Sequence, residues 1–226
     1  LGIIAAIGHT DADADQTRAA LDRGAAVAPH QFNAMRSLHH REPSAANALL
    51  DDSEAILELV NDGFHVDPSL ISLVFKAVGP GRVALITGAI VAAGMADGDY
   101  HLGPLPIHVA GGVARLIEGD GLAGSTMTMD VAFRRAVHDI GMSVSEASVA
   151  ASLTPARAIG VADSVGSLEP GKSADLVVLD DDVRVLAVMA RGDWVGKPDL
   201  PQQRQLSSDA TPIPTGHETP VPPMPQ

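Results

Sequence analysis

The chain has 226 residues, of which 46% are hydrophobic, and this suits one good-sized core with at most a small appendage. Its formal net charge of −13 argues against nucleic acid as a partner, because phosphate backbones are bound by clustered Lys and Arg. The absence of cysteine excludes disulfides, thiolate zinc sites and cysteine nucleophiles, and it fits a reducing compartment.

No apolar run approaches the roughly 18 residues that span a bilayer and no signal peptide is recognisable, so we expect a cytoplasmic protein without a membrane partner. The chain starts at Leu1 without an initiator Met, and we expect it to be a portion of something longer.

Two apolar runs near the N-terminus are each followed by a histidine. Residues 3–7 precede His9, and residues 25–28 precede His30. Continuous apolar runs of this length predict strands that are buried on both faces, and residues 15–23 between them predict a helix. The carboxyl ends of parallel strands are where α/β folds carry their chemistry, and imidazole is the commonest metal ligand. The pair therefore predicts metal ligands at neighbouring strand ends, and the alternative is two histidines hydrogen-bonded near turns.

The alternation of strand and helix continues after these runs. Residues 54–60 predict a third strand, residues 68–78 a helix, and residues 82–87 a fourth strand. This order predicts a parallel sheet with helical crossovers. Four such units are half of a closed eight-stranded barrel, so the strands over 3–7 and 82–87 are expected to have open edges.

Residues 94–121 interrupt this rhythm. They are rich in Gly, Pro and Asp, with short alternating stretches, and predict a β-hairpin insertion. Helices are expected to resume over residues 128–140 and 145–159, and Pro155 should end or kink the second of these.

The last part of the chain predicts strands followed by a tail. Residues 168–179 indicate a turn and a strand, and residues 183–195 indicate more strand. From residue 198 onward Pro, Gln, Ser and Thr dominate, and so little apolar surface cannot offset the entropy lost on ordering. We therefore expect a disordered tail over residues 198–226.

Six short runs carry the most specific pattern in the chain. They are Gly8-His9-Thr10, His30-Gln31-Phe32-Asn33-Ala34-Met35, Arg41-Glu42-Pro43, Asp62-Gly63-Phe64-His65-Val66, Leu122-Ala123-Gly124-Ser125 and Pro155-Ala156-Arg157-Ala158-Ile159-Gly160. In this order they resemble the N-acetylglucosamine-6-phosphate deacetylases of the amidohydrolase superfamily, over about residues 1–197. The later run over residues 166–177 is shared by many amidohydrolases, whereas the second and third runs mark the deacetylases.

The resemblance implies an α/β fold, namely the second half, about four βα units, of a TIM-barrel amidohydrolase plus part of a small β-sandwich appendage. Residues 1–160 would form a partial metal-dependent hydrolase barrel, residues 161–197 a β-strand appendage, and residues 198–226 the disordered Pro-rich tail. An upstream half of the barrel would carry the family's metal-binding glutamate.

The resemblance also implies a cofactor and a reaction. His9 and His30 fall on the family's metal-ligand histidines, so we expect a divalent metal, zinc or iron, at a site that is incomplete in this chain. The family hydrolyses the N-acetyl group of N-acetylglucosamine 6-phosphate to glucosamine 6-phosphate and acetate, and an aspartate after the eighth strand moves the proton. That position is Gly88 here, and loss of a general acid/base typically costs about 10²- to 10⁴-fold in rate. No catalytic residue is therefore assigned, and the alternative is a catalytically impaired chain that still binds sugar phosphate.

Four further residues fall on positions that bind the sugar phosphate in the family. Asn33 and Ala34 fall on positions that contact the phosphate, and His65 falls on a histidine that contacts the sugar phosphate. Arg41 falls on an arginine that the family supplies to the phosphate across a dimer interface. A guanidinium fork suits a phosphate dianion. The alternative for Arg41 is a surface ion pair with Glu42 or another nearby acid. The alternative for His65 is a loop histidine that is hydrogen-bonded to backbone.

Three other features bear on metal binding. The acidic run over residues 11–15 resembles the opening of a calcium loop, but it lacks the Gly and Glu that complete one, so a helix start is favoured. The adjacent pair His39 and His40 is better interpreted as loop residues, because adjacent side chains rarely converge on one ion. Pro29 removes a backbone donor beside His30 and is expected to displace that histidine.

Overall fold

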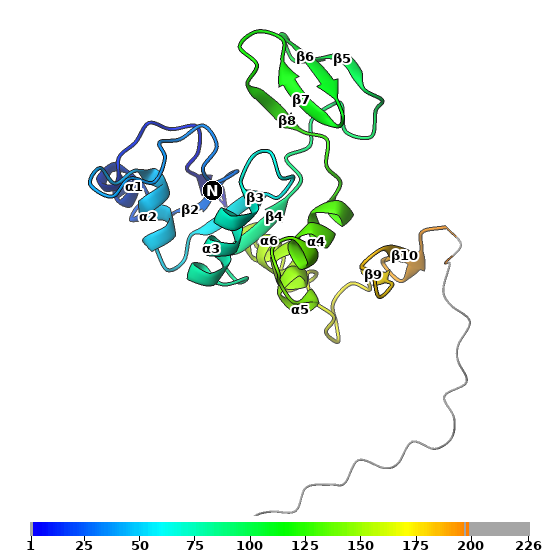
Figure 1. The fold of residues 1–226 in the computed structure, drawn as a ribbon. Helices are drawn as coiled ribbons and strands as arrows, with labels where there is room; N and C mark the ends of the chain where they lie inside the picture. The colour runs from blue at the N-terminus through cyan, green and yellow to red at the C-terminus, as the bar shows by residue number, and fades with distance from the viewer. Residues whose placement is uncertain (1, 197, 199–226) are drawn as a thin grey trace, which may run out of the picture.

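A computed structural model describes residues 2–196 and 198 of the chain. Its first part is a parallel sheet of order β1-β2-β3-β4, joined by helices that cross from each strand to the next (Figure 1). The strands are β1 (Ala5–Ala6), β2 (Ala25–Ala28), β3 (Ile56–Val60) and β4 (Val83–Ile86). The helices are α1 (Ala14–Leu21), α2 (Ala45–Asp51) and α3 (Pro68–Val78). The α/β class, the parallel sheet and the half-barrel order are confirmed.

The two outer strands of this sheet are β1 and β4, so the open edges expected from the sequence are confirmed. β1 is shorter than the apolar run that predicted it, and Ile3 and Ile4 before it are 80% and 45% exposed. A strand with one neighbour has half of its backbone groups unpaired and little to cover its side chains. The expectation of a strand buried on both faces is therefore wrong for β1, because both of its residues are exposed.

The core lies between the sheet and its helices. Leu57 and Leu59 alternate on one face of β3 and are fully buried, in the same cluster as Ile71 and Val74 from α3. The helix begins where its residues predict, because the Asp67 side chain accepts a hydrogen bond from the Ser69 N–H and a proline occupies the first helical position.

Helix α2 is absent from the elements expected from the sequence. Its start is marked by Ser44 and Asn47, whose side chain accepts hydrogen bonds from the Ser44 N–H at 2.9 Å and hydroxyl at 3.0 Å. The helix then buries Ala45, Ala46, Ala48 and Leu49. Alanine is small and differs little in hydrophobicity from its polar neighbours. The helical period of apolar residues is therefore hard to recognise in so short a segment.

The insertion is larger than the expected β-hairpin, and that prediction is wrong. It is a four-stranded antiparallel sheet of β5 (Gly98–Leu102), β6 (Leu105–Ala110), β7 (Val113–Leu116) and β8 (Leu122–Ser125), which stands apart from the parallel sheet in Figure 1. β5 and β8 contain glycines and polar residues that are typical of loops, and pairing with β6 and β7 overrides that local preference.

The next helical segments are α4 (Met129–His138), α5 (Val144–Ser148), a π-helical turn (Val149–Leu153) and α6 (Thr154–Ala158). The expected disturbance at Pro155 takes the form of this π turn, in which the Thr154 N–H donates to the Val149 carbonyl five residues back. Pro155 then lies in the first turn of α6, where its missing N–H costs nothing.

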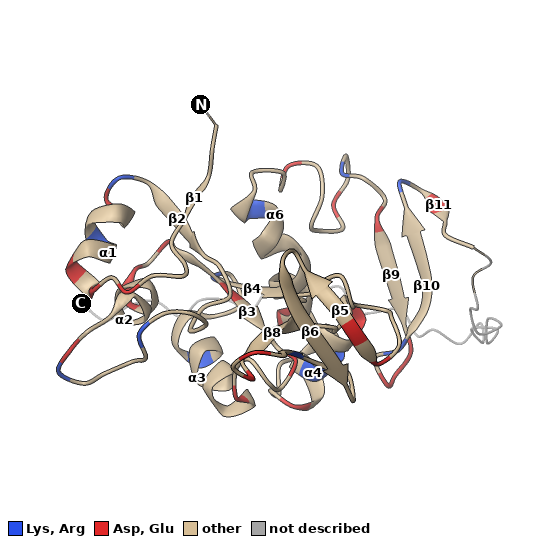
Figure 2. Cartoon of the chain, turned by 90° about the horizontal axis from the view of Figure 1, so that it is seen from above, with Lys and Arg blue, Asp and Glu red and all other residues tan. Residues whose placement is uncertain are grey.

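The final described elements are β9 (Leu176–Leu179), β10 (Val185–Ala190) and β11 (Asp193–Trp194), an antiparallel sheet at the opposite end of the molecule from α1 (Figure 1, Figure 2). The predicted strands are confirmed, while their place in a β-sandwich stays a prediction. The predicted tail lies, apart from Pro198, outside the described residues. Within the described part of the chain, no helix has the length and apolar character needed to cross a membrane.

The guanidinium of Arg82 joins three backbone carbonyls ahead of β3. Its Nε donates to Ala55 at 3.0 Å, and its Nη1 and Nη2 donate to Leu50 at 3.3 Å and to Leu49 at 2.8 Å. We predict that Arg82→Met lowers the free energy of unfolding by about 2 kcal/mol, because part-buried carbonyls lose a charged donor while the apolar stem remains.

The free energy is to be measured by urea unfolding of the full chain. Arg184→Met is the matched control, because Arg184 bonds to the side chain of Asp182 and both side chains are 67% exposed. Equal losses in the two variants would contradict a role for Arg82 in joining these carbonyls.

Candidate functional site

The structure brings His9 and His30 together at the carboxyl ends of β1 and β2. Their ring centroids are 4.7 Å apart and the planes meet at 70°. Both residues have left-handed backbone, with φ of 45° and 31°. Residues other than glycine persist in this conformation only where the surroundings impose it, and such strain concentrates at functional sites.

Pro29 does not displace His30 from this pair. The proline lies just beyond the last residue of β2, a position at which a missing ladder donor is tolerated. The following residue, Gln31, donates its backbone N–H to the Glu58 carbonyl at 2.8 Å, which ties the segment to β3. A Cβ on Gly8 would lie 2.5 Å from Pro29 Cγ, so the close approach of the two strand ends requires glycine at position 8.

An ion pair joins the loops that carry the two histidines. Arg36 Nε lies 2.5 Å from Asp11 Oδ1, and Arg36 Nη2 lies 2.7 Å from Asp11 Oδ2. The guanidinium pairing lowers the pKa of the Asp11 carboxyl. A bidentate pair fixes geometry even where solvent screening leaves it little net energy. A pocket of about 480 Å³ lies here, lined by His9, Thr10, Asp11, Ala34, Met35 and Arg36.

The histidine pair fits part of a metal site. His30 Nδ1 is buried and has no hydrogen-bond partner, so it is a nitrogen donor without a protein partner. Imidazole suits both zinc and iron. Among the residues that the structure describes, however, no three His, Cys, Asp or Glu side chains are grouped to hold an ion. Two nitrogen donors are present, and the described residues do not complete the coordination.

Glu58 is a carboxylate near this pair that the sequence did not single out. It lies on β3, where burial raises the pKa of its carboxyl and a hydrogen bond with the backbone of His30 opposes that rise. Alternation along β3 places it on the face opposite Leu57 and Leu59.

The loop after β3 contains a nearly buried pair of Asp62 and His65. Asp62 Oδ1 accepts the N–H groups of Phe64 and His65, both at 2.9 Å, and Asp62 Oδ2 lies 2.7 Å from His65 Nδ1. Burial by itself raises the pKa of Asp62, but the hydrogen bonds from His65 and Phe64 outweigh it and lower the pKa to about 2. The side-chain partner of His65 is therefore a carboxylate and not the backbone expected in the alternative.

Helix α4 holds this loop in place. Asn61 Nδ2 donates to the Ala132 carbonyl at 3.1 Å, and Arg135 Nε donates to the Asn61 carbonyl at 2.9 Å. Gly63 has φ of 85°, and a Cβ there would lie 2.5 Å from Arg135 Nη2. A side chain at residue 63 would therefore strain the backbone and require the Arg135 guanidinium to shift, and the loop is fixed from outside the sheet.

Of the other residues expected to bind the sugar phosphate, only Ala34 lines the pocket that contains His9. Asn33 Nδ2 donates to the carbonyls of His30 at 3.1 Å and Gln31 at 3.3 Å, so its side chain closes its own loop. Ala34 lines the pocket with His9. Arg41 is exposed on the loop beyond, where the His39 ring accepts its backbone N–H, and it is not part of that pocket.

Gly88 follows β4 and has left-handed backbone with φ of 61°. A Cβ at this position would lie 2.9 Å from Val60 Cγ2, and its carbonyl accepts the Ser125 N–H at 2.9 Å. The position therefore suits glycine, and any other residue would require Val60 to move.

The acidic run over residues 11–15 is a helix start, as favoured from the sequence. Asp13 Oδ1 accepts the Gln16 N–H at 2.8 Å and the Gln16 side chain accepts the Asp13 N–H at 3.1 Å, which is a capping box for α1. Asp15 pairs with Arg18 one turn later.

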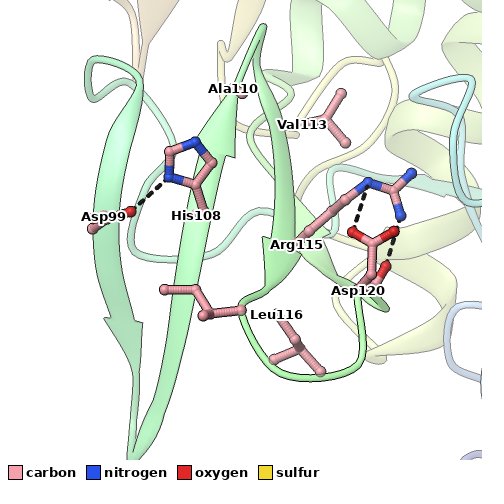
Figure 3. A pocket seen from close by; sticks show the side chains of 8 residues that line it. Asp99, His108, Ala110, Val113, Arg115, Leu116 and Asp120 are labelled. Atoms are coloured by element: carbon pink, nitrogen blue, oxygen red, sulfur yellow. Dashed lines mark hydrogen bonds and ion pairs between the residues drawn. The ribbon is translucent and has the colours of Figure 1, made fainter.

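A second pocket, of about 440 Å³, lies on the inserted sheet (Figure 3). An ion pair bounds it on each side, His108 Nδ1 with Asp99 Oδ1 at 2.6 Å and Arg115 Nε with Asp120 Oδ1 at 3.9 Å. No residue expected to bind metal or phosphate lines it.

Comparison with known proteins points to one family. The amidohydrolase family model matches residues 1–195. The N-acetylgalactosamine-6-phosphate deacetylase of Escherichia coli O157:H7 is 46% identical over 186 residues, which cover 82% of this chain and 49% of that protein. An aspartate-to-alanine mutant of the N-acetyl-D-glucosamine-6-phosphate deacetylase of Mycobacterium smegmatis, solved in complex with N-acetyl-D-glucosamine 6-phosphate, superposes with a TM-score of 0.82 at 49% identity, covering 85% of this chain and 51% of that one.

The chain thus spans about half the length of these relatives. One curated relative from Escherichia coli (strain K12) is matched over 96% of its own length and 72% of this chain, at 45% identity. The half-barrel fold, the order of the motifs and these matches agree, and we conclude that the chain belongs to the amidohydrolase family, with amino-sugar-phosphate deacetylases as its relatives.

Proposed function

We propose that this chain contributes to the metal-dependent hydrolysis of the N-acetyl group of N-acetylglucosamine 6-phosphate, which yields glucosamine 6-phosphate and acetate. The observation that carries the proposal is the contact of His9 and His30 at neighbouring strand ends, with His30 Nδ1 buried and without a partner. Relatives with 46% and 49% identity are named deacetylases of amino-sugar phosphates.

His9 and His30 are the residues that would hold a zinc or iron ion. Such an ion polarises a carbonyl and makes water a better nucleophile at neutral pH. The pair formed by Asp11 and Arg36 keeps the two histidine loops together, and the left-handed backbone of each histidine directs its ring toward the other. The remaining ligands would come from residues outside the described half-barrel.

The sugar phosphate is proposed to lie across the loops that follow β2 and β3. Ala34 belongs to the pocket with His9, and His65 is held by Asp62 on the next loop. Asn33 shapes the first of these loops through its bonds to backbone carbonyls. The exposed Arg41 suits donation to a phosphate in a second copy of the chain, which we propose as the homodimer partner in the cytoplasm.

A second candidate is a chain that binds metal and sugar phosphate with little turnover, and Gly88 favours it. Glycine has no group that accepts or returns a proton. The Mycobacterium smegmatis relative was solved with N-acetyl-D-glucosamine 6-phosphate after an aspartate had been changed to alanine, so in that protein the loss of one carboxylate is compatible with the complex.

We predict that the full chain binds Zn²⁺ through the histidine pair. His9→Asn and His30→Asn are each expected to weaken Zn²⁺ binding at least ~10-fold, because each removes a nitrogen donor. Affinity is to be measured by isothermal titration calorimetry with zinc chloride alone.

His138→Asn is the control for zinc binding, because His138 lies on α4 and its only close polar neighbour in the described residues is the Asp182 carbonyl at 3.4 Å. If His138→Asn weakens Zn²⁺ binding as much as the other two variants do, the histidine pair is not the metal site.

We predict that Gly88→Asp raises acetate release from N-acetylglucosamine 6-phosphate about 10²- to 10⁴-fold over the parent in the presence of added zinc, because a proton carrier is restored. Gly88→Asn is the matched control. Asp and Asn both tolerate left-handed backbone, and both place the same Cβ against Val60, so they share the packing cost.

Three outcomes separate the two candidate functions. Faster release with Asp and not with Asn supports the deacetylase. Zinc and sugar-phosphate binding without release from any variant supports the binding protein. A parent rate that Asp does not improve shows that position 88 does not carry the proton transfer.

A further inference from the structure

Among the described residues, Asp62 and His65 form the least exposed contact between an acidic and a basic side chain. Their side chains are 8% and 10% exposed, whereas each other pair has at least one side chain well exposed to solvent. Burying a carboxylate is costly unless its oxygens are hydrogen-bonded, and here both oxygens are. The arrangement is therefore a built contact and not a chance meeting of surface side chains.

The Asp62 carboxylate contacts both the backbone N–H and the ring of His65. Asp62 Oδ1 accepts the backbone N–H of His65 at 2.9 Å, and Asp62 Oδ2 lies 2.7 Å from the ring Nδ1. The bond to the backbone N–H closes the turn and so fixes the position of the His65 Cα and Cβ atoms. The contact with Nδ1 then fixes the orientation of the ring. Two points of attachment leave the ring little freedom to rotate.

The same contact determines which ring nitrogen carries the proton. An ionised carboxylate only accepts hydrogen bonds, so His65 Nδ1 must be the donor. The pKa of Asp62 is lowered to about 2, so this carboxyl stays ionised at neutral pH. Nε2 is the other ring nitrogen, and it makes no hydrogen bond within the part of the chain that the structure describes.

The loop that carries the pair is itself fixed from helix α4. Arg135 donates to the Asn61 carbonyl, Asn61 donates to the Ala132 carbonyl, and the Arg135 guanidinium lies close against Gly63. The position of the Asp62 carboxylate therefore follows from the packing of α4 against the sheet and not from a free loop.

We propose that Asp62 is a positioning residue for His65. It holds the Nδ1–H form of the ring in one orientation, so that Nε2 is presented to the phosphate of the sugar ligand. A neutral ring offers Nε2 as an acceptor to a protonated phosphate oxygen or a hydroxyl, and a doubly protonated ring offers Nε2–H to a phosphate dianion while Asp62 balances the charge. This inference rests on the proposed function only in taking a sugar phosphate as the ligand of His65.

The test compares the full-length parent chain with Asp62→Asn. Long-range ¹H–¹⁵N spectra of ¹⁵N-labelled protein distinguish the two neutral ring forms, and His65→Gln identifies the signals. The parent is expected to show protonated Nδ1. In Asp62→Asn the amide oxygen still accepts the backbone N–H groups, but its NH₂ group then faces Nδ1, so the proton is expected to move to Nε2.

Binding of N-acetylglucosamine 6-phosphate to the same proteins is measured by calorimetry. Asp62→Asn is expected to weaken binding of the sugar phosphate about 10- to 100-fold, the range found when the residue that orients a metal-binding histidine is lost. Asp67→Asn is the matched control. It removes the same charge two residues beyond His65, and Asn replaces Asp well at the start of α3, where residue 67 accepts the Ser69 N–H.

The outcomes are distinct. A parent ring that is protonated at Nε2 and not at Nδ1 overturns the inference. This outcome is read from the parent alone, so the proposal can still be tested if Asp62→Asn does not fold. An unchanged ring form together with unchanged binding in Asp62→Asn also overturns it. A parent that binds no sugar phosphate contradicts the proposed function, while the spectra still decide whether Asp62 selects the ring form of His65.

Discussion

The parallel pairing of β1 to β4 is the constraint on which the site depends. Because all four strands run the same way, the segments that follow them emerge at one edge of the sheet. Neighbouring strands lie about 4.8 Å apart, so residues after adjacent strand ends come within contact distance. The rings of His9 and His30, which follow neighbouring strands, are 4.7 Å apart. The loops with His65 and Gly88 follow the next two strands.

Local signals in the sequence were enough to predict this sheet, the helix α3 and the placement of the two histidines. Apolar runs bounded by turn residues predict the strands of this sheet. Helix α3 is predicted by the Asp cap and the first-turn proline at its start. The inserted sheet could not be predicted in full, because β5 and β8 become strands only through pairing with β6 and β7. Helix α2 was missed for a related reason, since its alanines are buried by the fold and do not form a recognisable stripe.

The contacts that hold the site together differ in how readily the sequence predicts them. Asp62 and His65 are three residues apart in an Asp-Gly turn, so their contact could have been inferred from the turn alone. Asp11 and Arg36 are 25 residues apart, and Arg135 and Asn61 are 74 apart, so these bonds depend on the completed fold. The left-handed backbone at His9 and His30 is likewise hard to predict locally, because it is uncommon for any residue other than glycine even though histidine adopts it more often than most.

The carboxylates near the site offer no replacement for the side chain that position 88 lacks. Asp62 has both oxygens engaged by His65 and Phe64, and a carboxyl with a pKa of about 2 is a weak base. Burial raises the pKa of Glu58, which would suit a proton carrier better, but its hydrogen bond is with the backbone of His30. Glycine itself fits the left-handed backbone at position 88 without moving Val60, so a change to glycine there leaves the neighbouring strands undisturbed. In the proposed function, binding and proton transfer are therefore separable, because the histidines proposed to bind lie after β1, β2 and β3 while the proposed position of the proton carrier lies after β4.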